Sequence, residues 1–487
     1  SRRLLGPACG SGIFLVGFFN RIAEEWARAN PHATYDERVD ALIELLRDKI
    51  VGVDSNGTAC RIAAFSLYLA LLDQLDPPAI RRLKERGRRL PPLVYDPVKA
   101  VRAAARDWGA TLYNADFADA PLPKDPEEEF DLVVGNPPWV SRAGREKVTK
   151  GAKGKGAAKR KVPPPERPPL LRWCDDQDPP LPVAQEQLTY GFMWKAPRHL
   201  KAGGRCCLLV PKGVLLNHQD KSIAFQATWF QAHAVERVIN LADLRRQLFE
   251  GLEAPALVVR FRPEPPTNAT SRTGRTQIEY FAPKTEWAGY RADLLVVSAA
   301  DRTLVDQMSI VHALERGEAP TVWKERLWGT PRDWLLLERL AGLPKLDRLL
   351  YQPSKGERRE GLRRWVVGQG FQPEKDNRRR KRSKARPWGD HTRMVEGKQE
   401  LNLLLAKDEC PPLKERYPWL RRYPFKSRAI FHAPHVLVSQ GLRVAFADFP
   451  AVFRHALQGI HGPRKDETLL LFLAAALASP VTRYFCF

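Results

Sequence analysis

The sequence predicts an α/β protein built on an open, mostly parallel sheet with helices on both faces, followed by a second domain of mixed α+β structure. Two observations predict the first domain. Short apolar runs alternate with helical patterns through the first half of the chain, and each run stops at a turn that carries polar residues. The carboxyl ends of parallel strands meet at one edge of such a sheet, which is where ligands bind.

A glycine-rich turn comes directly after the first apolar run. Leu4 and Leu5 lead into the turn GPACGSG (residues 6–12), and a helical pattern then continues from Ile13 to about Ala29. Glycine has no Cβ, so this layout lets backbone N–H groups approach a cofactor closely. Glycine-rich turns are also common as purely structural turns. This motif therefore indicates a cofactor site only in combination with the polar turns after the later strands.

The next two runs each end in an acidic residue. Residues 49–54 form an apolar strand pattern that ends at Asp54, and residues 110–117 repeat it with Asp116 beside Phe117. An acid at the end of the second strand of a βαβ unit commonly bonds ribose hydroxyls, although an Asp there can also cap a helix. Asp116 is placed to accept from an adenine amine while Phe117 packs on the ring.

The fourth run, residues 130–134, leads through a glycine into the tetrapeptide NPPW (residues 136–139). Two consecutive prolines supply no backbone N–H and have a fixed φ, so the strand ends here in a stiff extended loop. Asn136 Oδ1 and the Pro137 carbonyl are two acceptors for the two protons of an exocyclic amine, and Trp139 offers a stacking surface. The same dipeptides also mark ordinary turns.

Composition divides the remaining chain. We predict a first domain over residues 1–262, interrupted by a basic, Pro- and Gly-rich insertion at about 142–185, then a connecting region at 263–320 and a second domain at 321–487. The insertion is expected to be a mobile loop, either an arm that closes over a bound strand or a tolerated surface insertion.

The second domain contains a basic cluster near its centre. It consists of Arg378, Arg379, Arg380, Lys381 and Arg382, with tryptophan and phenylalanine residues on both sides in the sequence. Basic and aromatic residues together suit phosphate neutralisation with base stacking, although charge runs are also common in solvated linkers. The apolar pattern over residues 467–485 predicts a helix in the core of this domain.

Charge and cysteine usage limit the function classes. The 487 residues include 79 Lys and Arg against 56 Asp and Glu, a formal net charge of +23, which favours a polyanion partner, with nucleic acid ahead of membrane. The seven cysteines are scattered and form no C-x-x-C motif, so we expect no metal site and a reducing compartment. Because the chain starts without Met and close to a strand, we expect it to be a piece of a longer protein.

These motifs together resemble the gamma-class amino DNA methyltransferases, in particular TaqI-type and type IIG restriction–modification methylases. The resemblance covers residues 1–262 and rests on four motifs in the family's order and spacing. They are GPACGSGIFL (residues 6–15), Asp54, NADF (residues 114–117) and NPPW (residues 136–139). The C-terminal part resembles the family's target-recognition domain more loosely. One departure is Gly6, where the family usually carries an acidic residue.

The resemblance implies a methyltransferase sheet that binds S-adenosyl-L-methionine over the glycine-rich turn. The cofactor-binding residues that it implies are Pro7, Ala8, Cys9, Gly10, Gly12, Asp54, Asp116 and Phe117. The catalytic residues that it implies are Asn136, Pro137, Trp139 and Phe249. Phe249 corresponds to a second family aromatic that packs on a base flipped out of the duplex.

The expected function is therefore site-specific methylation of the N6 amine of a flipped adenine in duplex DNA, within a restriction–modification or phage-defence system of the prokaryotic cytoplasm. Flipping costs a few kcal/mol, which aromatic stacking at about 1–3 kcal/mol per base offsets. A nuclease domain or subunit is an expected partner. The alternatives are a catalytically inactive DNA-binding subunit, which Gly6 motivates, and methylation of N4-cytosine, RNA or protein glutamine.

Overall fold

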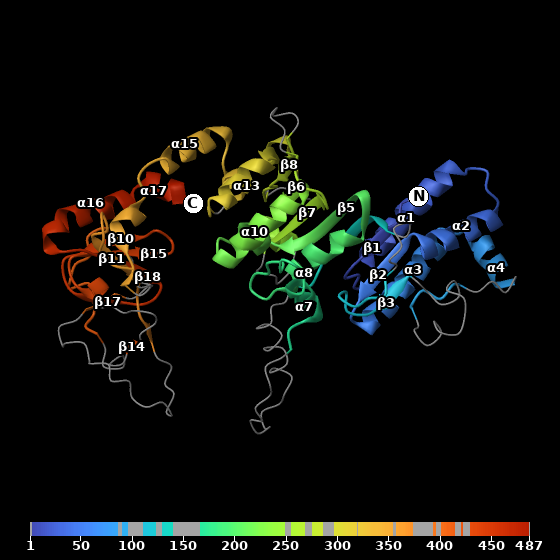
Figure 1. Cartoon of the computed structure of the whole chain (residues 1–487), viewed down its shortest axis with the longest axis horizontal. Coiled ribbons are helices and arrows are strands. Elements are labelled where there is room, and N and C mark those ends of the chain that lie inside the picture. The colour runs from blue at the N-terminus through green and yellow to red at the C-terminus, as the bar shows by residue number, and fades with distance from the viewer. Residues whose placement is uncertain are drawn as a thin grey trace, which may run out of the picture. The chain divides into compact units, whose positions relative to one another are not determined.

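The chain folds into two compact units in the computed structural model, residues Ser1–Thr330 (unit 1) and Pro331–Phe487 (unit 2) (Figure 1). The structure describes residues 2–85, 90–95, 111–122, 129–139, 166–248, 255–267, 275–285, 297–318, 320–353, 357–373, 393–395, 401–413, 420–421 and 429–486. None of the described helices combines the length and the apolar character that a bilayer crossing requires.

Unit 1 is organised around a nine-stranded sheet in the order β3-β2-β1-β4-β5-β7-β6-β8-β9. Neighbours from β3 to β5 run parallel, and β7 lies antiparallel between β5 and β6. The strands are β1 (Leu4–Gly6), β2 (Ile50–Asp54), β3 (Leu112–Asn114), β4 (Phe130–Gly135), β5 (Leu200–Pro211), β6 (Ala234–Asn240), β7 (Ala256–Arg262), β8 (Gln277–Phe281) and β9 (Arg302–Asp306). This methyltransferase-like mixed sheet confirms the predicted fold class.

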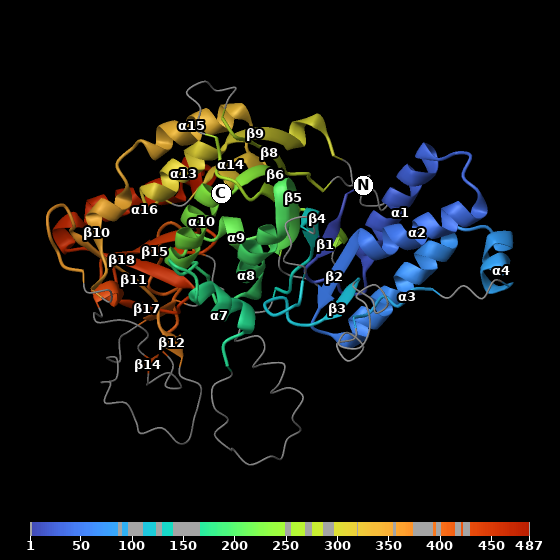
Figure 2. The ribbon, with the colours of Figure 1, turned by 45° about the vertical axis from the view of Figure 1, so that its right-hand side comes forward.

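Helices cover the two faces of this sheet with separate hydrophobic clusters. One cluster joins α1, α2 and α3 to β1, β2 and β3, and the other joins the opposite face to α7, α8, α10, α13 and α14 (Figure 2). The helices of unit 1 are α1 (Ile13–Ala29), α2 (Tyr35–Asp48), α3 (Gly57–Asp73), α4 (Pro77–Glu85), α7 (Pro169–Asp175), α8 (Leu188–Lys195), α9 (Gly213–Leu216), α10 (Asp220–Ala232), α11 (Arg245–Leu248), α13 (Gln307–Glu315), α14 (Val322–Trp328), and the short 3₁₀ helices η3 (Ala196–His199) and η5 (Ala299–Asp301).

The strand register brings the four predicted polar turns to one edge of the sheet. Gly6 at the end of β1 pairs with Gly52, and Asp54 at the end of β2 pairs with Asn114. On the other side of β1, Leu5 pairs with Val133, two residues before β4 ends. The four parallel strands therefore end side by side, as the alternation of apolar runs predicts.

Two predicted boundaries differ from the structure. The expected loop at 142–185 includes helix α7, which buries Leu170, Leu171 and Cys174 against α8; residues 140–165 lie outside the described part of the chain. The expected connecting region at 263–320 contains β8 and β9, which extend the sheet, and the units divide after Thr330. In both places tertiary burial stabilises short elements whose local composition is typical of loops.

Unit 2 contains a five-stranded mixed sheet in the order β10-β11-β18-β15-β16, and two pairs of strands, β12-β14 and β13-β17. The strands are β10 (Leu350–Tyr351), β11 (Trp365–Gln369), β12 (Gln372–Pro373), β13 (Arg393–Val395), β14 (Leu420–Arg421), β15 (His435–Ser439), β16 (Val444–Ala447), β17 (Ala451–Phe453) and β18 (Leu457–His461). The helices are α15 (Pro331–Ala341), α16 (Glu467–Ala478), α17 (Pro480–Cys486), η6 (Leu346–Leu349), η8 (Ala429–Phe431) and η9 (Arg464–Asp466).

The predicted C-terminal core helix is two helices, and only part of the first is buried. α16 ends at Ala478 and α17 begins at Pro480, because proline supplies no N–H to continue the helix and fits its first turn. Leu470 and Ala474 are buried in α16, whereas Phe472 is 71% exposed. The prediction of a single buried helix was therefore wrong.

Candidate active site

The glycine-rich turn after β1 is closed by its own backbone. Gly10 and Gly12 have φ of +55° and +86°, a region that side chains with a Cβ rarely adopt. A Cβ on Gly12 would lie 3.0 Å from the Ala63 Cβ of α3, whereas one on Gly10 would meet nothing within 4 Å. The turn thus packs tightly against α3 at Gly12 and leaves open space at Gly10, where a cofactor has room to lie.

Asp54 joins this turn to the start of α3. One carboxylate oxygen accepts from the Gly10 N–H at 2.9 Å, and the other accepts from the Asn56 N–H at 2.8 Å. Asn56 in turn caps α3 by accepting from Thr58 N at 3.0 Å. Each carboxylate oxygen has a second lone pair, so Asp54 retains acceptor capacity for ribose hydroxyls after making these bonds.

The Cys9 thiol lies beneath the turn and does not face the cofactor side. Cys9 and Cys60 are buried together, and the hydrogen bond between the two thiols and burial raise the pKa of Cys9 far above its usual range. Cys9 is therefore a neutral thiol at pH 7. Its contribution to the turn is its backbone, since its N–H donates to the Val53 carbonyl at 2.9 Å.

Two glycines beneath the turn leave room for one side chain of α1. A Cβ on Gly6 would lie 2.9 Å from Leu15 Cδ2, and a Cβ on Gly52 would lie 2.8 Å from Leu15 Cδ1. Leu15 is fully buried between these strands. At position 6, where the family usually carries an acid, the space that a side chain would take is thus filled by Leu15.

In the loop after β3, the side chains of the two predicted residues, Asp116 and Phe117, point to different surroundings. The Asp116 carboxylate accepts from the Ala118 N–H at 2.9 Å, and the loop is joined to β2 by the bond from Ala115 N to the Asp54 carbonyl at 3.1 Å. Phe117 is 4% exposed and stacks on Phe192 with ring centroids 5.2 Å apart. The structure therefore brings Asp116 to the neighbourhood of Asp54, while the Phe117 ring faces the interior, in contrast to the predicted contact with an adenine.

In the NPPW loop after β4, Pro138 and Trp139 are hydrogen-bonded, whereas Asn136 has no side-chain partner within the described part of the chain. Asn136 is exposed, and the described residues give neither its side chain nor the Pro137 carbonyl a hydrogen-bond partner. The next carbonyl, that of Pro138, accepts from Thr189 Oγ1 at 3.0 Å. The half-buried Trp139 donates its indole N–H to the Leu209 carbonyl of β5 at 3.3 Å.

Thr189, which is fully buried in α8, was not predicted from the sequence. Its hydroxyl reaches across 51 residues of sequence to the Pro138 carbonyl. The only signal in the sequence is a threonine within the apolar stretch LTYGFMW of α8. A buried hydroxyl requires a partner, so such a residue is worth noting wherever a helix is predicted to lie under a functional loop.

The turns after β1 and β4 lie next to each other. A Cβ on Gly135 would lie 3.2 Å from the Pro7 ring, so Pro7 packs against the residue that precedes Asn136. Ala8 packs against the neighbouring hydrophobic cluster. The structure thus gathers Gly10, Asp54 and the NPPW loop at one edge. Phe249 lies outside the described residues, so its predicted position beside the base stays a prediction.

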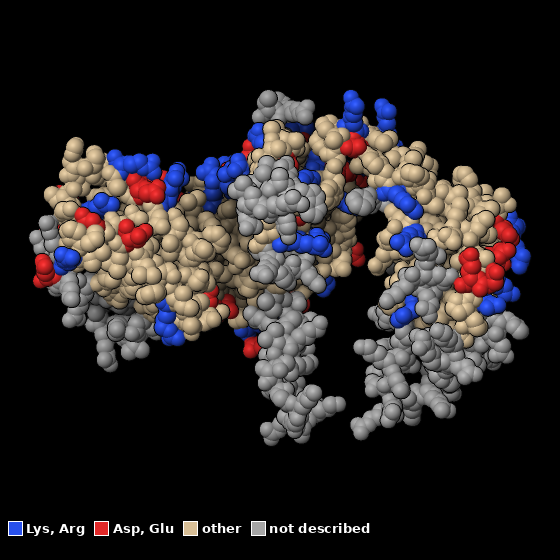
Figure 3. Space-filling model, turned by 180° about the vertical axis from the view of Figure 1, so that it is seen from behind, with Lys and Arg blue, Asp and Glu red and all other residues tan. Residues whose placement is uncertain are grey.

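On the one face that Figure 3 shows, the described basic residues form no single continuous patch. On the face of the molecule in Figure 3, lysine and arginine side chains lie in several separate groups with acidic residues among them. The predicted cluster Arg378–Arg382 lies outside the described residues. Within the part of the chain that is described, no group of three or more His, Cys, Asp or Glu side chains is arranged to hold a metal ion.

The sheet and its edge define the class of this protein, an α/β methyltransferase-like fold with a glycine-rich cofactor turn beside an Asn-Pro-Pro-Trp loop. Residues 48–164 match the family described as Eco57I restriction-modification methylase. This stretch, which carries Asp54, Asp116 and the NPPW loop, is similar to the restriction–modification methylases, in agreement with the resemblance found in the sequence. A methyltransferase family implies S-adenosylmethionine as the methyl donor.

Two characterised relatives are similar over part of the chain. The type II methyltransferase M.PaeR7I of Pseudomonas aeruginosa is 32% identical over 139 residues, which are 28% of this chain and 18% of that protein. The adenine-specific methyltransferase PglX of Streptomyces coelicolor is 25% identical over 154 residues, 28% of this chain and 12% of that protein. The matched regions are thus less than a fifth of either relative's length.

Two solved structures align with nearly the whole chain at low identity. The type IIL restriction-modification enzyme MmeI in complex with DNA aligns over 96% of this chain and 58% of its own, with a TM-score of 0.49 and 13% identity. The type IIG restriction endonuclease BpuSI aligns over 97% of this chain and 52% of its own, with a TM-score of 0.41 and 12% identity.

Proposed function

We propose that this chain transfers a methyl group from S-adenosylmethionine to the N6 amine of a flipped adenine in duplex DNA. The observation that carries the proposal is the exposed Asn136 amide, which has no partner among the described residues and lies at the carboxyl edge, just before two residues that are hydrogen-bonded in place, Pro138 and Trp139. The adenine-specific relative PglX supports the choice of base.

The residues at the edge have complementary roles. Asn136 Oδ1 and the Pro137 carbonyl accept the two protons of the amine, which localises the nitrogen lone pair and aims it. Trp139 stacks on the extruded base, a contact of about 1–3 kcal/mol that offsets unstacking from the duplex. Holding the methyl donor and the target amine in a fixed geometry lowers the activation barrier, because the entropy of orienting them is lost on binding and not in the chemical step.

Cofactor binding falls to the neighbouring turns. The open space at Gly10 and the remaining lone pairs of Asp54 fit a nucleoside with free ribose hydroxyls, and Asp116 fits its adenine amine. When bound, S-adenosylmethionine supplies an electrophilic methyl group on a sulfonium. Pro7 holds this turn against the start of the NPPW loop, so the two binding functions share one rigid edge.

The direct test is methyl transfer by the chain in its natural full-length context. Duplex DNA is incubated with labelled S-adenosylmethionine, and the products are hydrolysed and identified by mass spectrometry. We expect N6-methyladenine. N4-methylcytosine instead would retain the mechanism and change the base, whereas label in RNA or protein only would contradict the proposal.

A catalytically inactive DNA-binding subunit is the second candidate, and Gly6 favours it because the family's acid at this position is replaced. Calorimetry with S-adenosylhomocysteine separates the two. Binding heat with a one-to-one ratio supports the enzyme. No heat, together with intact DNA binding, supports the inactive subunit.

The DNA-binding role that we propose for unit 2 predicts a salt dependence. If the cluster Arg378–Arg382 contacts phosphates, the logarithm of affinity falls with log[salt] at a slope of about −0.9 per contact. Reversing the charge of three of these residues should make the slope less steep by about two to three units. An unchanged slope would assign the cluster to a solvated linker.

A further inference from the structure

Each arginine within the strands β1 to β9 of unit 1 forms an ion pair with an acid of the same sheet. Glu236 pairs with three of them at nitrogen–oxygen distances between 2.9 and 3.3 Å, and Glu279 pairs with the other two. The paired residues are Arg205, Arg237, Arg260, Arg262 and Arg302. The strands therefore leave no arginine without a direct counter-ion.

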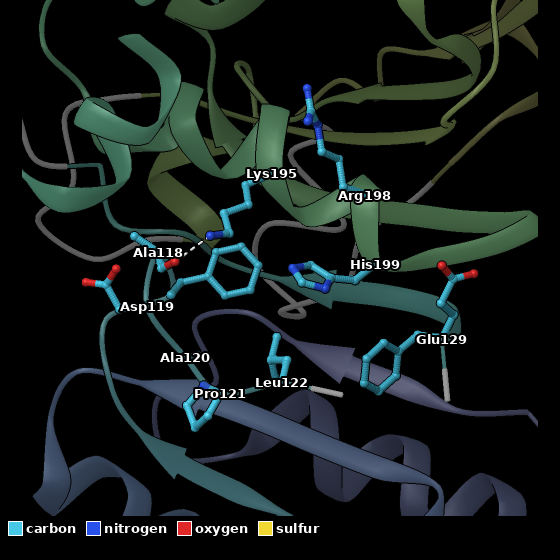
Figure 4. Close-up of a pocket in the computed structure, with 11 residues that line it drawn as sticks. Ala118, Asp119, Ala120, Pro121, Leu122, Glu129, Lys195, Arg198 and His199 are labelled. Carbon is cyan, nitrogen blue, oxygen red and sulfur yellow. Dashed lines mark hydrogen bonds between the residues drawn. The ribbon is translucent and has the colours of Figure 1, made fainter. Parts of the chain in front are cut away.

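The Lys195 ammonium is also compensated within the protein. Lys195 lines a cavity of about 670 Å³ together with Asp119, and its Nζ donates to the Ala118 carbonyl (Figure 4). Burial lowers the pKa of Lys195, and the charges of the Asp119 and Asp116 carboxylates oppose that effect. This cation therefore needs no anion from outside the protein.

Three cations that follow the carboxyl ends of β5 and β6 differ from these, and we call Lys212, Arg245 and Arg246 the basic row. Lys212 comes directly after β5, and the two arginines begin α11 after β6. Lys212 and Arg246 are exposed, and within the described part of the chain none of the three forms an ion pair. The acid closest to the arginines in sequence is engaged elsewhere, since the Asp243 carboxylate accepts from Thr285 N at 2.8 Å.

Backbone hydrogen bonds bring the two segments of the basic row together beside the start of β7. The Lys212 N–H donates to the Pro255 carbonyl at 2.8 Å, and the Leu241 N–H donates to the Ala256 carbonyl at 3.0 Å. Leu244 is 2% exposed and anchors the turn that leads into α11. Two neighbouring carbonyls of one strand thus hold both segments at the edge of the sheet.

The basic row begins beside the NPPW loop. The Trp139 indole bonds the Leu209 carbonyl of β5, which lies shortly before Lys212 in the chain. Neighbouring strands of a sheet lie about 4.8 Å apart, so β6 is about 14 Å from β4 in the order β4-β5-β7-β6. A DNA strand rises about 3.4 Å per nucleotide, so the basic row extends over about four nucleotides from the strand that carries the loop.

The NPPW loop separates this edge into halves of opposite charge. On the side of β2 and β3 the edge carries Asp54 and Asp116, and on the side of β5 and β6 it carries the basic row. Phosphates are repelled by the first half and attracted by the second, because unpaired exposed cations attract a polyanion. The charges therefore favour a nucleic-acid backbone on one side of the loop only.

We propose that the basic row binds backbone phosphates of duplex DNA within about four nucleotides of the flipped base, on one side of it. This inference rests on the proposed function and names positioning residues for it. Contacts to phosphates fix the register of a protein on the duplex without reading its sequence. Flipping turns the target nucleotide about its backbone, so phosphates held next to it keep the neighbouring nucleotides in place while the base leaves the stack.

The salt dependence of DNA binding tests this proposal in the full-length protein. A fluorescent duplex is titrated at several salt concentrations, and the slope of log affinity against log[salt] is measured. Changing Lys212, Arg245 and Arg246 together to Gln should make the slope less steep by about 2–3 units, at about 0.9 per phosphate contact. Lys201→Gln is the matched control, because Lys201 also has no ion pair among the described residues but lies at the opposite end of β5. Its slope should equal that of the wild type.

The proposal is wrong if the triple variant keeps the wild-type slope, if Lys201→Gln changes the slope as much per charge, or if the wild type does not bind duplex DNA. Methyl transfer by the same wild-type preparation is scored separately. A reduced slope without N6-methyladenine would retain the phosphate contacts and reject the methylation, whereas methylation with an unchanged slope would do the reverse. Thermal unfolding checks the fold, and if the triple variant does not fold, Lys212→Gln alone decides, with an expected change of about 0.9.

Discussion

The loops after β1 and β4 lie side by side at one edge of the sheet but are fixed in different ways. The glycine-rich turn is held through the side chain that we assign to the cofactor, because both Asp54 oxygens accept backbone N–H groups. Among the described residues, the NPPW loop is hydrogen-bonded through its last two residues, Pro138 and Trp139, and the Asn136 side chain has no partner. In the glycine-rich turn, the Asp54 carboxylate both holds the backbone and is proposed to bind the cofactor. In the NPPW loop, Pro138 and Trp139 hold the backbone, and Asn136 is proposed to bind the substrate amine.

This difference predicts how substitutions separate binding from chemistry. A change at Asp54 disturbs both the turn and the ligand it binds. A change at Asn136 removes the proposed acceptor for the substrate amine and leaves the position of the NPPW loop unchanged. A change at Thr189 shifts the position of the NPPW loop without removing a group that contacts the base, so we expect a smaller loss of kcat than at Asn136. We expect the largest effect at Asn136 and the smallest at Trp139.

Asn136→Ala should lower kcat for methyl transfer by about 10²–10³-fold, the size of effect seen when one positioned hydrogen-bonding group is removed from an active site. DNA affinity and S-adenosylhomocysteine affinity should stay near wild type because no described contact depends on this amide. Single-turnover methyl transfer measures the effect, and Asn136→Asp is the control because it retains an acceptor. Wild-type rates in Asn136→Ala would refute the role of this residue.

Asp54→Asn should weaken S-adenosylhomocysteine binding about 10- to 100-fold. The variant has one neutral acceptor oxygen, so of the two backbone bonds from Gly10 and Asn56 one loses its acceptor and the other loses its charge assistance. Calorimetry measures the affinity, and Asp220→Asn on the exposed start of α10 is the control. An unchanged affinity would mean that Asp54 serves the turn alone.

Thr189→Val should lower kcat about tenfold and leave cofactor affinity unchanged. The valine keeps the shape of the side chain but leaves the Pro138 carbonyl without its donor, a loss of about 1–3 kcal/mol when the group is buried. Thr189→Ser retains the hydroxyl and should restore kcat. If valine retains the wild-type kcat and serine loses it, packing of the methyl group and not the hydrogen bond positions the loop.

Trp139→Phe should have the smallest effect, about a threefold loss in kcat/KM. Phenylalanine keeps an aromatic face for stacking but cannot donate to the Leu209 carbonyl, a bond with a net contribution of about 0.5–1.5 kcal/mol. Trp139→Leu removes the aromatic face as well and should lose distinctly more. Equal losses in the two variants would show that stacking contributes little.

The elements that form the edge could be predicted because their signals are local. An apolar run followed by glycine or by two prolines fixes where β1 and β4 end, and the register of parallel strands then brings those ends together. The bond from Thr189 to Pro138 could not be predicted, because it depends on how α8 packs under β4 and leaves no pattern in the sequence. The same holds for the Phe117 ring, which the interior contact with Phe192 directs inward.

The elements that were missed share a physical cause. Helix α7 has seven residues, too few to be stable alone, and forms because Leu170 and Leu171 are buried against α8. β8 and β9 extend the sheet from a region whose prolines and polar residues suggested a boundary. Short segments of this kind acquire their structure from neighbours, so composition alone misassigns them.

The packing of Leu15 between Gly6 and Gly52 also constrains how this sequence can change over generations. A side chain at position 6 would collide with Leu15 Cδ2 at 2.9 Å, so an acid cannot be regained there by a single codon change without displacing a fully buried leucine. Shortening Leu15 first opens a void that persists until the second change fills it. The glycine and the leucine therefore act as a packed pair, and any side chain introduced at position 6 requires Leu15 to shift.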